Sequence, residues 1–240
     1  MTTFHVLQII TWAFIHVLQF NISNQHLPDS ITEDRINKPY RPIASGRVTH
    51  SRAKLFRWAA VPACLLWSSL YGGALLLMSI AFMGFTLAYN EFGFGRYAIA
   101  REFLNGIGCM MLCTAATLIA LPPPERMIQW AIVSSMIIST GAHATTIYAQ
   151  DFRDIEGDKH VGRCTVPIKY PQEVTRPLLM AFMVGWSLAL AKRWSLGLVG
   201  SSVYIALAAF VGTRFVLLRD SRSDKVSYEI YCVSPVPLSI

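Results

Sequence analysis

The stretch Asp151-Phe-Arg-Asp154-Ile-Glu-Gly-Asp158 follows the apolar segment Met127–Ala149 after a single residue. An apolar segment of that length can cross the hydrocarbon core of a membrane as a helix. If the acidic stretch is also helical, at about 100° per residue, Asp151, Asp154 and Asp158 lie within roughly 60° of one another. The sequence therefore predicts a membrane-spanning helix that ends in three carboxylates on one face.

Convergent carboxylates at a membrane boundary are typical of a site for a divalent cation. The negative charges repel one another and lose hydration unless a positive charge lies among them. Mg²⁺ binds one or two carboxylates together with substrate phosphate oxygens. We therefore interpret the acidic stretch as a clamp for a phosphorylated substrate. The alternative is an acidic helix start, where carboxylates complement the helix dipole.

The composition indicates a membrane protein. The chain is 53% hydrophobic and only 15% charged, against about 25% charged residues in a typical soluble protein. The predominantly apolar segments are Phe4–Phe20, Arg57–Leu70, Gly73–Tyr89, Glu102–Leu121, Met127–Ala149, Arg176–Ala191 and Ser195–Leu218, with an eighth in Val226–Ile240 that Pro235 and Pro237 break late. We expect an all-α, polytopic transmembrane helical bundle that forms one domain over residues 1–240.

Positive charge is distributed unevenly between the connecting segments. Seventeen of the 21 Lys and Arg residues lie in residues 21–57, 90–101, 150–176 and 219–225, which alternate crossings place on one side of the membrane. Excess Lys and Arg marks the cytosolic side, so the long loops are predicted to be cytosolic. Attraction to anionic lipids is a second explanation for this charge. The interleaving of basic residues with membrane spans argues against a nucleic-acid partner.

The first long loop, residues 21–47, combines acids and amides with a cluster of cations. Acids can bind Mg²⁺, while Arg and Lys can neutralise phosphate oxygens directly. This combination suits a diphosphate. Glu33 has two interpretations, because Ser30-x-x-Glu33 also fits a capping box at a helix start.

Two motifs in this chain resemble the motifs of a known protein family. The stretch Asp34-Arg-Ile-Asn-Lys-Pro-Tyr-Arg-Pro-Ile-Ala-Ser-Gly-Arg47 resembles the sequence that follows the first acidic motif of the UbiA superfamily of intramembrane prenyltransferases. Asp151 to Asp158, followed by Lys159, Gly162, Arg163 and Thr165-Val-Pro167, resembles the second motif of the same family. The resemblance covers nearly the whole chain in order.

The resemblance implies a UbiA-like bundle. Family members have nine transmembrane helices, with the first motif after helix two and the second after helix six. In this chain the motifs follow the first and fifth apolar segments, so about eight of the nine helices are expected and the family's first helix is missing from the sequence. Loss of that helix would expose a packing face to lipid.

The first motif departs from the family pattern. The usual opening acids are absent, and Asn24-Gln25 stands about two residues upstream of the expected position. An amide can bind Mg²⁺ through its carbonyl oxygen but supplies no negative charge, so this half of the site should hold metal more weakly. This form resembles a fungal branch of the superfamily that includes membrane-bound terpene cyclases.

The resemblance also implies site residues, a cofactor and partners. Mg²⁺ is the expected cofactor, held by Asp34, Asp151, Asp154 and Asp158, which are the expected catalytic residues, and by Asn24. The diphosphate of the substrate is expected to contact Asn24, Lys38, Arg41, Asn90, Arg96, Lys159 and Arg163. The expected partners are an isoprenyl diphosphate of C10–C20 chain length, the lipid bilayer and a lipophilic acceptor. The expected location is the endoplasmic reticulum or another endomembrane.

The expected reaction is ionisation of the isoprenyl diphosphate with release of diphosphate. The carbocation then either cyclises, which the form of the first motif favours narrowly, or is captured by an aromatic or other lipophilic acceptor. Tyr89, Trp130 and Tyr148 are candidates for stabilising the cation through their ring faces, with anchoring at the membrane interface as the alternative. A transporter or inactive scaffold is a third, less favoured class.

Overall fold

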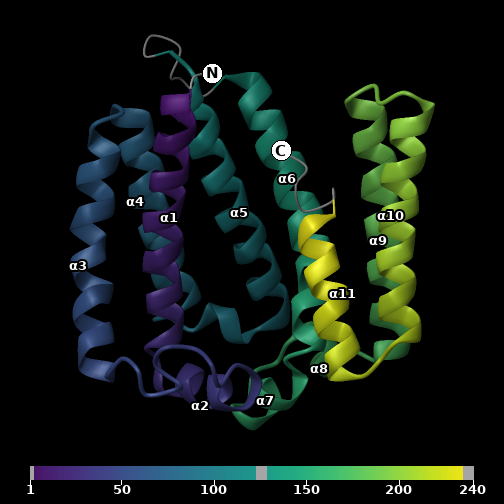
Figure 1. Cartoon of the computed structure of the whole chain (residues 1–240), viewed down its shortest axis with the longest axis horizontal. Coiled ribbons are helices and arrows are strands. Elements are labelled where there is room, and N and C mark those ends of the chain that lie inside the picture. The colour runs from purple at the N-terminus through teal and green to yellow at the C-terminus, as the bar shows by residue number, and fades with distance from the viewer. Residues whose placement is uncertain (1–2, 123–128, 235–240) are drawn as a thin grey trace. The chain divides into compact units, whose positions relative to one another are not determined.

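The computed structural model describes residues 3–122 and 129–234, and these form a helical protein (Figure 1). The elements are α1 (Thr3–Gln25), α2 (Pro28–Asn37), α3 (His50–Ser69), α4 (Gly73–Tyr89), η1 (Phe94–Arg96), α5 (Ala98–Ala120), α6 (Trp130–Thr146), η3 (Ile147–Phe152), α7 (Ile155–His160), α8 (Val166–Lys169), α9 (Gln172–Arg193), α10 (Leu198–Leu217) and α11 (Ser221–Val233). Each of the eight predicted apolar segments corresponds to a helix. Residues 127–128 and 235–240 of those segments lie outside the described part of the chain.

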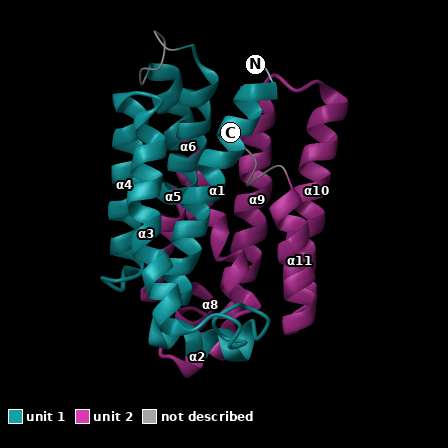
Figure 2. Cartoon of the chain, turned by 60° about the vertical axis from the view of Figure 1, so that its left-hand side comes forward, with its two compact units in different colours: residues 1–95, 107–137 teal, residues 96–106, 138–240 magenta. Residues whose placement is uncertain are grey.

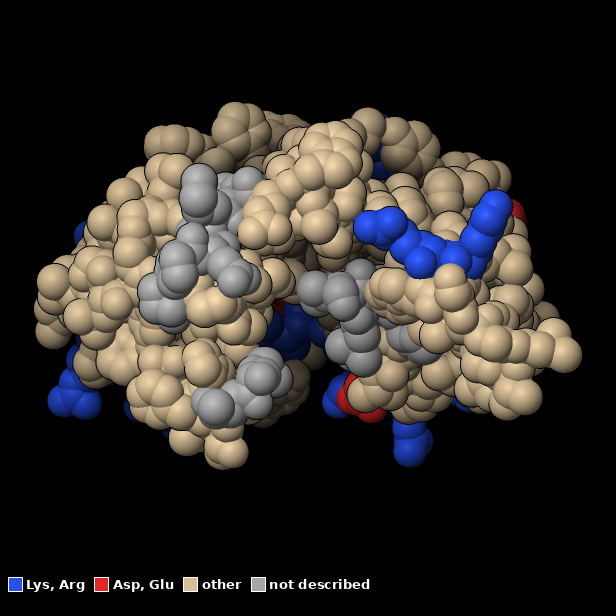
Figure 3. Space-filling model, turned by 90° about the horizontal axis from the view of Figure 1, so that it is seen from above, with Lys and Arg blue, Asp and Glu red and all other residues tan. Residues whose placement is uncertain are grey.

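Five of the described helices are long and apolar enough to cross a membrane, namely α1, α4, α5, α9 and α10. Helices α6 and α11 are shorter, with 17 and 13 residues, and α3 begins with charged residues. Large apolar side chains also lie on the outside of the protein, for example Leu77, Ile137 and Leu198. Figure 3 shows one face on which uncharged residues cover most of the surface. The prediction of an all-α, polytopic membrane bundle is confirmed.

The chain divides into two compact units that are interleaved in sequence (Figure 2). Unit 1 comprises Met1–Gly95 and Ile107–Ile137, and unit 2 comprises Arg96–Gly106 and Ile138–Ile240. Helices α5 and α6 each contribute residues to both units. The division separates the two acidic motifs, because the first belongs to unit 1 and the second to unit 2.

Unit 1 buries an apolar cluster together with paired polar groups. The cluster contains Trp12, Leu75 and Leu118. The indole of Trp12 donates to Ser68 Oγ at 2.8 Å, and His16 Nε2 lies 2.7 Å from Ser79 Oγ. Polar groups away from water are costly unless they form hydrogen bonds. These contacts therefore join α1 to both α3 and α4.

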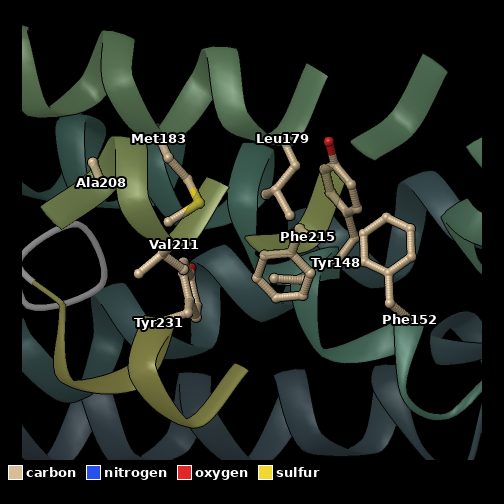
Figure 4. Packing of buried hydrophobic residues seen from close by; sticks show 9 residues of the cluster. Tyr148, Phe152, Leu179, Met183, Ala208, Val211, Phe215 and Tyr231 are labelled. Carbon is tan, nitrogen blue, oxygen red and sulfur yellow. The ribbon is translucent and has the colours of Figure 1, made fainter. Parts of the chain in front are cut away.

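Unit 2 is built around an antiparallel helix pair, α9 and α10, with α11 and η3 packed against it. The core contains Tyr148, Phe152, Leu179, Met183, Ala208, Val211, Phe215 and Tyr231 (Figure 4). The hydroxyl groups of Tyr231 and Thr146 form a hydrogen bond of 2.8 Å inside this core. Arg176 and Asp224, both fully buried, form an ion pair of 2.7 Å between α9 and α11.

Two helices begin earlier than the apolar pattern predicts. Helix α3 begins at His50 and α9 at Gln172, whereas the predicted segments begin at Arg57 and Arg176. Both arginines are buried inside helices, because each is neutralised by a carboxylate: Arg57 contacts the partly buried Glu91 at 3.0 Å, and Arg176 contacts the buried Asp224. Buried ion pairs of this kind cannot be recognised from local hydropathy.

Candidate active site

The second acidic motif is not one continuous α-helix. Asp151 lies in the 3₁₀ helix η3, Asp154 precedes α7, and Asp158 lies within α7. The backbone bonds nevertheless follow the motif, since Asp154 N donates to Asp151 O at 3.1 Å and Asp158 N donates to Asp154 O at 3.0 Å. The premise of a regular α-helix through the three acids was therefore wrong, although all three lie on consecutive helical turns.

Asp151 is fully buried, and only one of its two carboxylate oxygens accepts hydrogen bonds from an arginine. Arg101, at the start of α5, donates to Asp151 Oδ1 from Nε at 3.2 Å and from Nη2 at 2.9 Å. Asp151 Oδ2 is also buried and accepts no hydrogen bond from a nitrogen donor of the described residues, and the carboxyl groups of Asp151 and Glu102 interact. Burial raises the pKa of Asp151, Arg101 opposes this effect, and the nearby Asp154 carboxylate raises the pKa further. A buried carboxylate oxygen without a donor is suited to binding a cation.

The other two acids of this motif also have arginine neighbours. Asp154 and Asp158 are buried. Arg153 Nε lies 3.6 Å from Asp154 Oδ1, and Arg163 Nη1 lies 3.2 Å from Asp158 Oδ1. Lys159, which lies between Asp158 and Arg163 in sequence, is exposed. The structure thus brings the predicted residues Asp158 and Arg163 together.

The first motif shows the same pairing in unit 1. Asp34 in α2 is buried, and Arg41 Nη1 donates to its two carboxylate oxygens at 2.7 and 3.0 Å. Burial raises the pKa of Asp34, while Arg41 lowers it. The neighbouring Glu33 accepts from Lys38 Nζ at 3.2 Å and from Asn37 Nδ2 at 2.8 Å. In this arrangement Asp34 and Glu33 therefore lie beside two of the predicted substrate cations.

The capping-box interpretation of Glu33 is wrong. Helix α2 begins at Pro28, and Leu27 is the residue at its N-cap, where no side chain supplies a hydrogen bond. Ser30 and Glu33 are therefore inside the helix. Pro28 at the first helical position explains the earlier start, because proline is favoured there.

The remaining predicted residues lie near helix ends. Asn24 is half-buried in the last turn of α1. Asn90 follows α4 and donates to Ser23 Oγ at 3.1 Å, which joins it to a polar network within unit 1. Arg96 belongs to unit 2, where its side chain donates to Val161 O at 3.2 Å and its carbonyl oxygen accepts from Cys164 N at 2.9 Å. Arg96 thus connects η1 to the loop that follows α7.

Sequence reasoning assigned no role to Arg101 or Glu102. Arg101 pairs with Asp151, and these two residues lie 50 positions apart in the sequence. Glu102 is buried, and its carboxyl group interacts with that of Asp151. The signal that could have revealed Glu102 is an acid at the edge of an apolar segment, because acids within membrane spans usually mark functional sites.

The aromatic candidates differ in environment. Tyr89 is buried in unit 1, with its ring 5.5 Å from that of Phe20 and 6.0 Å from that of Phe85. Tyr148 is buried in unit 2 and donates its hydroxyl to Thr175 O at 3.0 Å. Trp130 is 78% exposed at the start of α6, so its position is that expected of an interfacial anchor.

The described residues contain no cluster of three His, Cys, Asp or Glu side chains arranged to hold a metal ion. Their donor chemistry nevertheless fits a hard cation, since the aspartates offer carboxylate oxygens and Asp151 Oδ2 is buried without a donor. What the geometry shows directly is a recurring pair, in which a buried aspartate lies beside an arginine. Such pairs combine groups that can bind a metal with groups that can bind phosphate.

Comparison with known proteins gives a consistent result. Residues 2–233 match the model of the UbiA prenyltransferase family. The chain is 32% identical to the fumagillin beta-trans-bergamotene synthase of Aspergillus fumigatus, over 94% of this chain and 76% of that protein. It is 31% identical to a diterpene cyclase of Hericium erinaceus, over 93% of this chain and 71% of that protein. A solved structure of a digeranylgeranylglyceryl phosphate synthase superposes with a TM-score of 0.67 at 20% identity, covering 99% of this chain and 84% of that one.

The fold is that of an integral membrane enzyme built from helices, and the acidic motifs lie on short helices outside the long spans. The chain belongs to the UbiA prenyltransferase family. Members of this family act on prenyl diphosphates, and that general chemistry applies here. The resemblance inferred from the two motifs is confirmed.

Proposed function

We propose that the protein ionises an isoprenyl diphosphate within the membrane, releases diphosphate and cyclises the remaining hydrocarbon chain. The observation that carries this proposal is the placement of an arginine beside each of the buried aspartates of the two motifs, namely Asp34, Asp151, Asp154 and Asp158. A diphosphate with its metal ions requires both kinds of group, carboxylates for the metal and cations for the phosphate oxygens.

The four aspartates and Asn24 are the residues that would hold Mg²⁺. Because the described residues form no complete cage of protein ligands, the substrate's phosphate oxygens would supply the remaining ligands, as Mg²⁺ prefers. When bound, Mg²⁺ supplies positive charge that stabilises the departing diphosphate. Mg²⁺ dependence is part of the proposal and is tested below.

The cations of the two motifs would neutralise the rest of the diphosphate. Arg41 and Arg163 contact the carboxylates that we assign to the metal, and a bound metal would leave their guanidinium groups available to phosphate oxygens. Lys159 is exposed and can reach an anion without breaking a contact to a carboxylate. Lys38, Asn90 and Arg96 complete the proposed set of diphosphate-binding residues.

Bond breaking follows from this charge arrangement. The allylic C–O bond breaks, its electron pair leaves with the diphosphate, and a carbocation remains on the hydrocarbon chain. The apolar helices keep water from that cation. Of the three aromatic candidates, Tyr89 and Tyr148 are buried and are retained as stabilisers, while the exposed Trp130 is not.

Cyclisation is favoured over transfer because two relatives at 31–32% identity are named as a terpene synthase and a cyclase. The alternative is intermolecular prenyl transfer to an aromatic or other lipophilic acceptor, which the family description favours. We further propose a location in the endoplasmic reticulum or another endomembrane, with the acidic motifs on the cytosolic side. The excess of Lys and Arg in the loops that carry these motifs supports that orientation.

The test of cyclisation is product analysis. Membranes containing the protein are incubated with C10, C15 and C20 isoprenyl diphosphates, with and without aromatic acceptors. A cyclic hydrocarbon formed without acceptor is the expected result. If a prenylated acceptor is the sole enzymatic product, the proposal of cyclisation is wrong and the protein is an intermolecular prenyltransferase.

A further inference from the structure

Two adjoining cavities lie beside the start of α9, both lined by residues of unit 2. The first, of about 470 Å³, is lined almost entirely by apolar side chains, including Ile99, Phe103, Val174, Leu178 and Phe182. Its volume is in the range of small-molecule sites. The second, of about 530 Å³, is lined by Lys169, Glu173 and Arg219 among others. Tyr170 and Pro171 line both cavities and so connect them.

The two cavities differ in polarity: the one along α9 is apolar, and the one at the start of α9 is charged. From Pro171 to Phe182 the apolar cavity follows α9 for eleven residues, which is about 16 Å of helix. That length is about half of the ~30 Å hydrocarbon core of a bilayer, or one leaflet. The charged cavity lies at the end of unit 2 where Figure 1 shows α8 and the connection from α10 to α11, opposite the turn between α9 and α10.

The charges of the second cavity favour a singly charged anion. Lys169 forms no ion pair with the described residues, and its Nζ lies 5.4 Å from the ring centre of Tyr170. Arg219 Nη1 contacts Glu173 Oε1 at 3.4 Å, and both side chains are largely exposed. Two positive groups and one negative group leave a net charge of +1. A phosphodiester carries one negative charge and matches it, whereas a diphosphate carries more and would be poorly neutralised.

We propose that this pair of cavities binds one anionic membrane phospholipid. One acyl chain lies in the apolar cavity along α9, and the phosphodiester lies between Lys169 and Arg219. None of the four aspartates lines either cavity, although Glu102 and Tyr148 do line the apolar one, so the site adjoins the residues of the proposed reaction. Its partner is fixed by three features: an apolar groove one leaflet long, a cationic end at the end of a membrane-spanning helix, and a net charge of +1.

The test counts lipids bound to the purified full chain by native mass spectrometry. The delipidated protein is titrated with phosphatidylglycerol, of net charge −1, or with phosphatidylcholine, of net charge zero. We expect one tightly bound phosphatidylglycerol and weaker binding of phosphatidylcholine. Each Lys or Arg near a membrane surface contributes roughly fivefold to binding of anionic lipid, so Lys169→Ala with Arg219→Ala should weaken phosphatidylglycerol binding by about 25-fold.

A matched control lies at the opposite end of the same helix. Lys192→Ala with Arg193→Ala removes the same charge from exposed positions of α9 that line neither cavity. This control should retain the tight lipid. Leu178→Trp, which fills the apolar cavity, should lose it even though every cation remains, and a thermal melt of each variant reports whether the protein is folded.

Three results would overturn the proposal. The first is equal retention of phosphatidylglycerol and phosphatidylcholine, and the second is an equal loss of lipid in the two double variants. The third is displacement of the lipid by a C15 isoprenyl diphosphate whose own binding requires Lys169 and Arg219, since the cavities would then belong to the substrate.

Discussion

At the scale of single residues, the account depends on the oxygens of the buried aspartates. Asp154→Asn removes negative charge while retaining size, so it should lower Mg²⁺-dependent turnover by roughly a hundredfold or more, the typical cost of losing one group that stabilises developing charge. Glu156→Gln is the matched control, because Glu156 lies in the same motif but is exposed. Turnover of isoprenyl diphosphate in membranes is the measurement. Comparable activity of Asp154→Asn and Glu156→Gln would remove Asp154 from the metal site.

Asn24 offers a gain-of-affinity test. If its carbonyl oxygen binds the metal, Asn24→Asp adds negative charge and should lower the Mg²⁺ concentration for half-maximal activity by up to about tenfold, or ~1.4 kcal/mol. Asn24→Leu should lose activity, because it removes the oxygen. Mg²⁺ titrations of both variants test the assignment. If both variants have the same Mg²⁺ titration curve as the wild-type protein, Asn24 does not bind the metal and has only a structural place in the last turn of α1.

The candidate residues of each motif could be predicted because the two motifs are local sequence patterns. Their partners could not. Arg101 reaches Asp151 across 50 positions, and no local pattern distinguishes it from an arginine that marks the cytosolic side. The break between η3 and α7 was also missed, because neither glycine nor proline lies between Asp151 and Asp154 to indicate it.

At the scale of elements, a buried ion pair joins α9 to α11. Arg176 donates to both oxygens of Asp224 at 2.7 Å, and also to Phe215 O at 2.7 Å. Asp224→Ala leaves Arg176 charged, buried and without its carboxylate, which should lower the free energy of unfolding by about 3–5 kcal/mol. Thermal unfolding in detergent measures the loss. Replacing both residues by leucine should recover part of it, and a variant Asp224→Ala as stable as wild type would contradict the role of the pair.

Because α9 packs closely against α10, substitutions at two glycines should change the stability of the protein differently. A Cβ atom at Gly212 would lie 2.6 Å from Met180 Cγ and 2.9 Å from Met180 Cα, so the helices must separate. Gly212→Ala should destabilise the protein by about 1–3 kcal/mol. Gly185→Ala meets nothing within 4 Å and should be neutral or stabilising by up to ~1 kcal/mol, because alanine favours a helix. Melting temperatures that change alike in both variants would refute this packing.

The existence and order of the helices formed by the eight apolar segments followed from the sequence, because each membrane span requires a long apolar segment. Their boundaries followed less well. Helices α3 and α9 extend past Arg57 and Arg176, whose charges are satisfied inside the protein by distant acids. Helix α2 begins before Ser30 because Pro28 occupies its first position, and the capping-box pattern gave the wrong start.

At the scale of the whole molecule, family membership and the aspartate–arginine pairs support one reaction, the ionisation of an isoprenyl diphosphate. The relatives named as a synthase and a cyclase favour ring closure as the fate of the cation. The prediction of a single domain stays a prediction, because the described chain forms two compact units that share α5 and α6.

The most direct test of the central claim is the release of inorganic diphosphate by the purified full chain from C10, C15 and C20 isoprenyl diphosphates, without any acceptor. The account predicts release with at least one chain length, its loss when a chelator removes Mg²⁺, and its recovery when Mg²⁺ is restored. No release from any of the three substrates, or release that continues undiminished in the presence of the chelator, would contradict it.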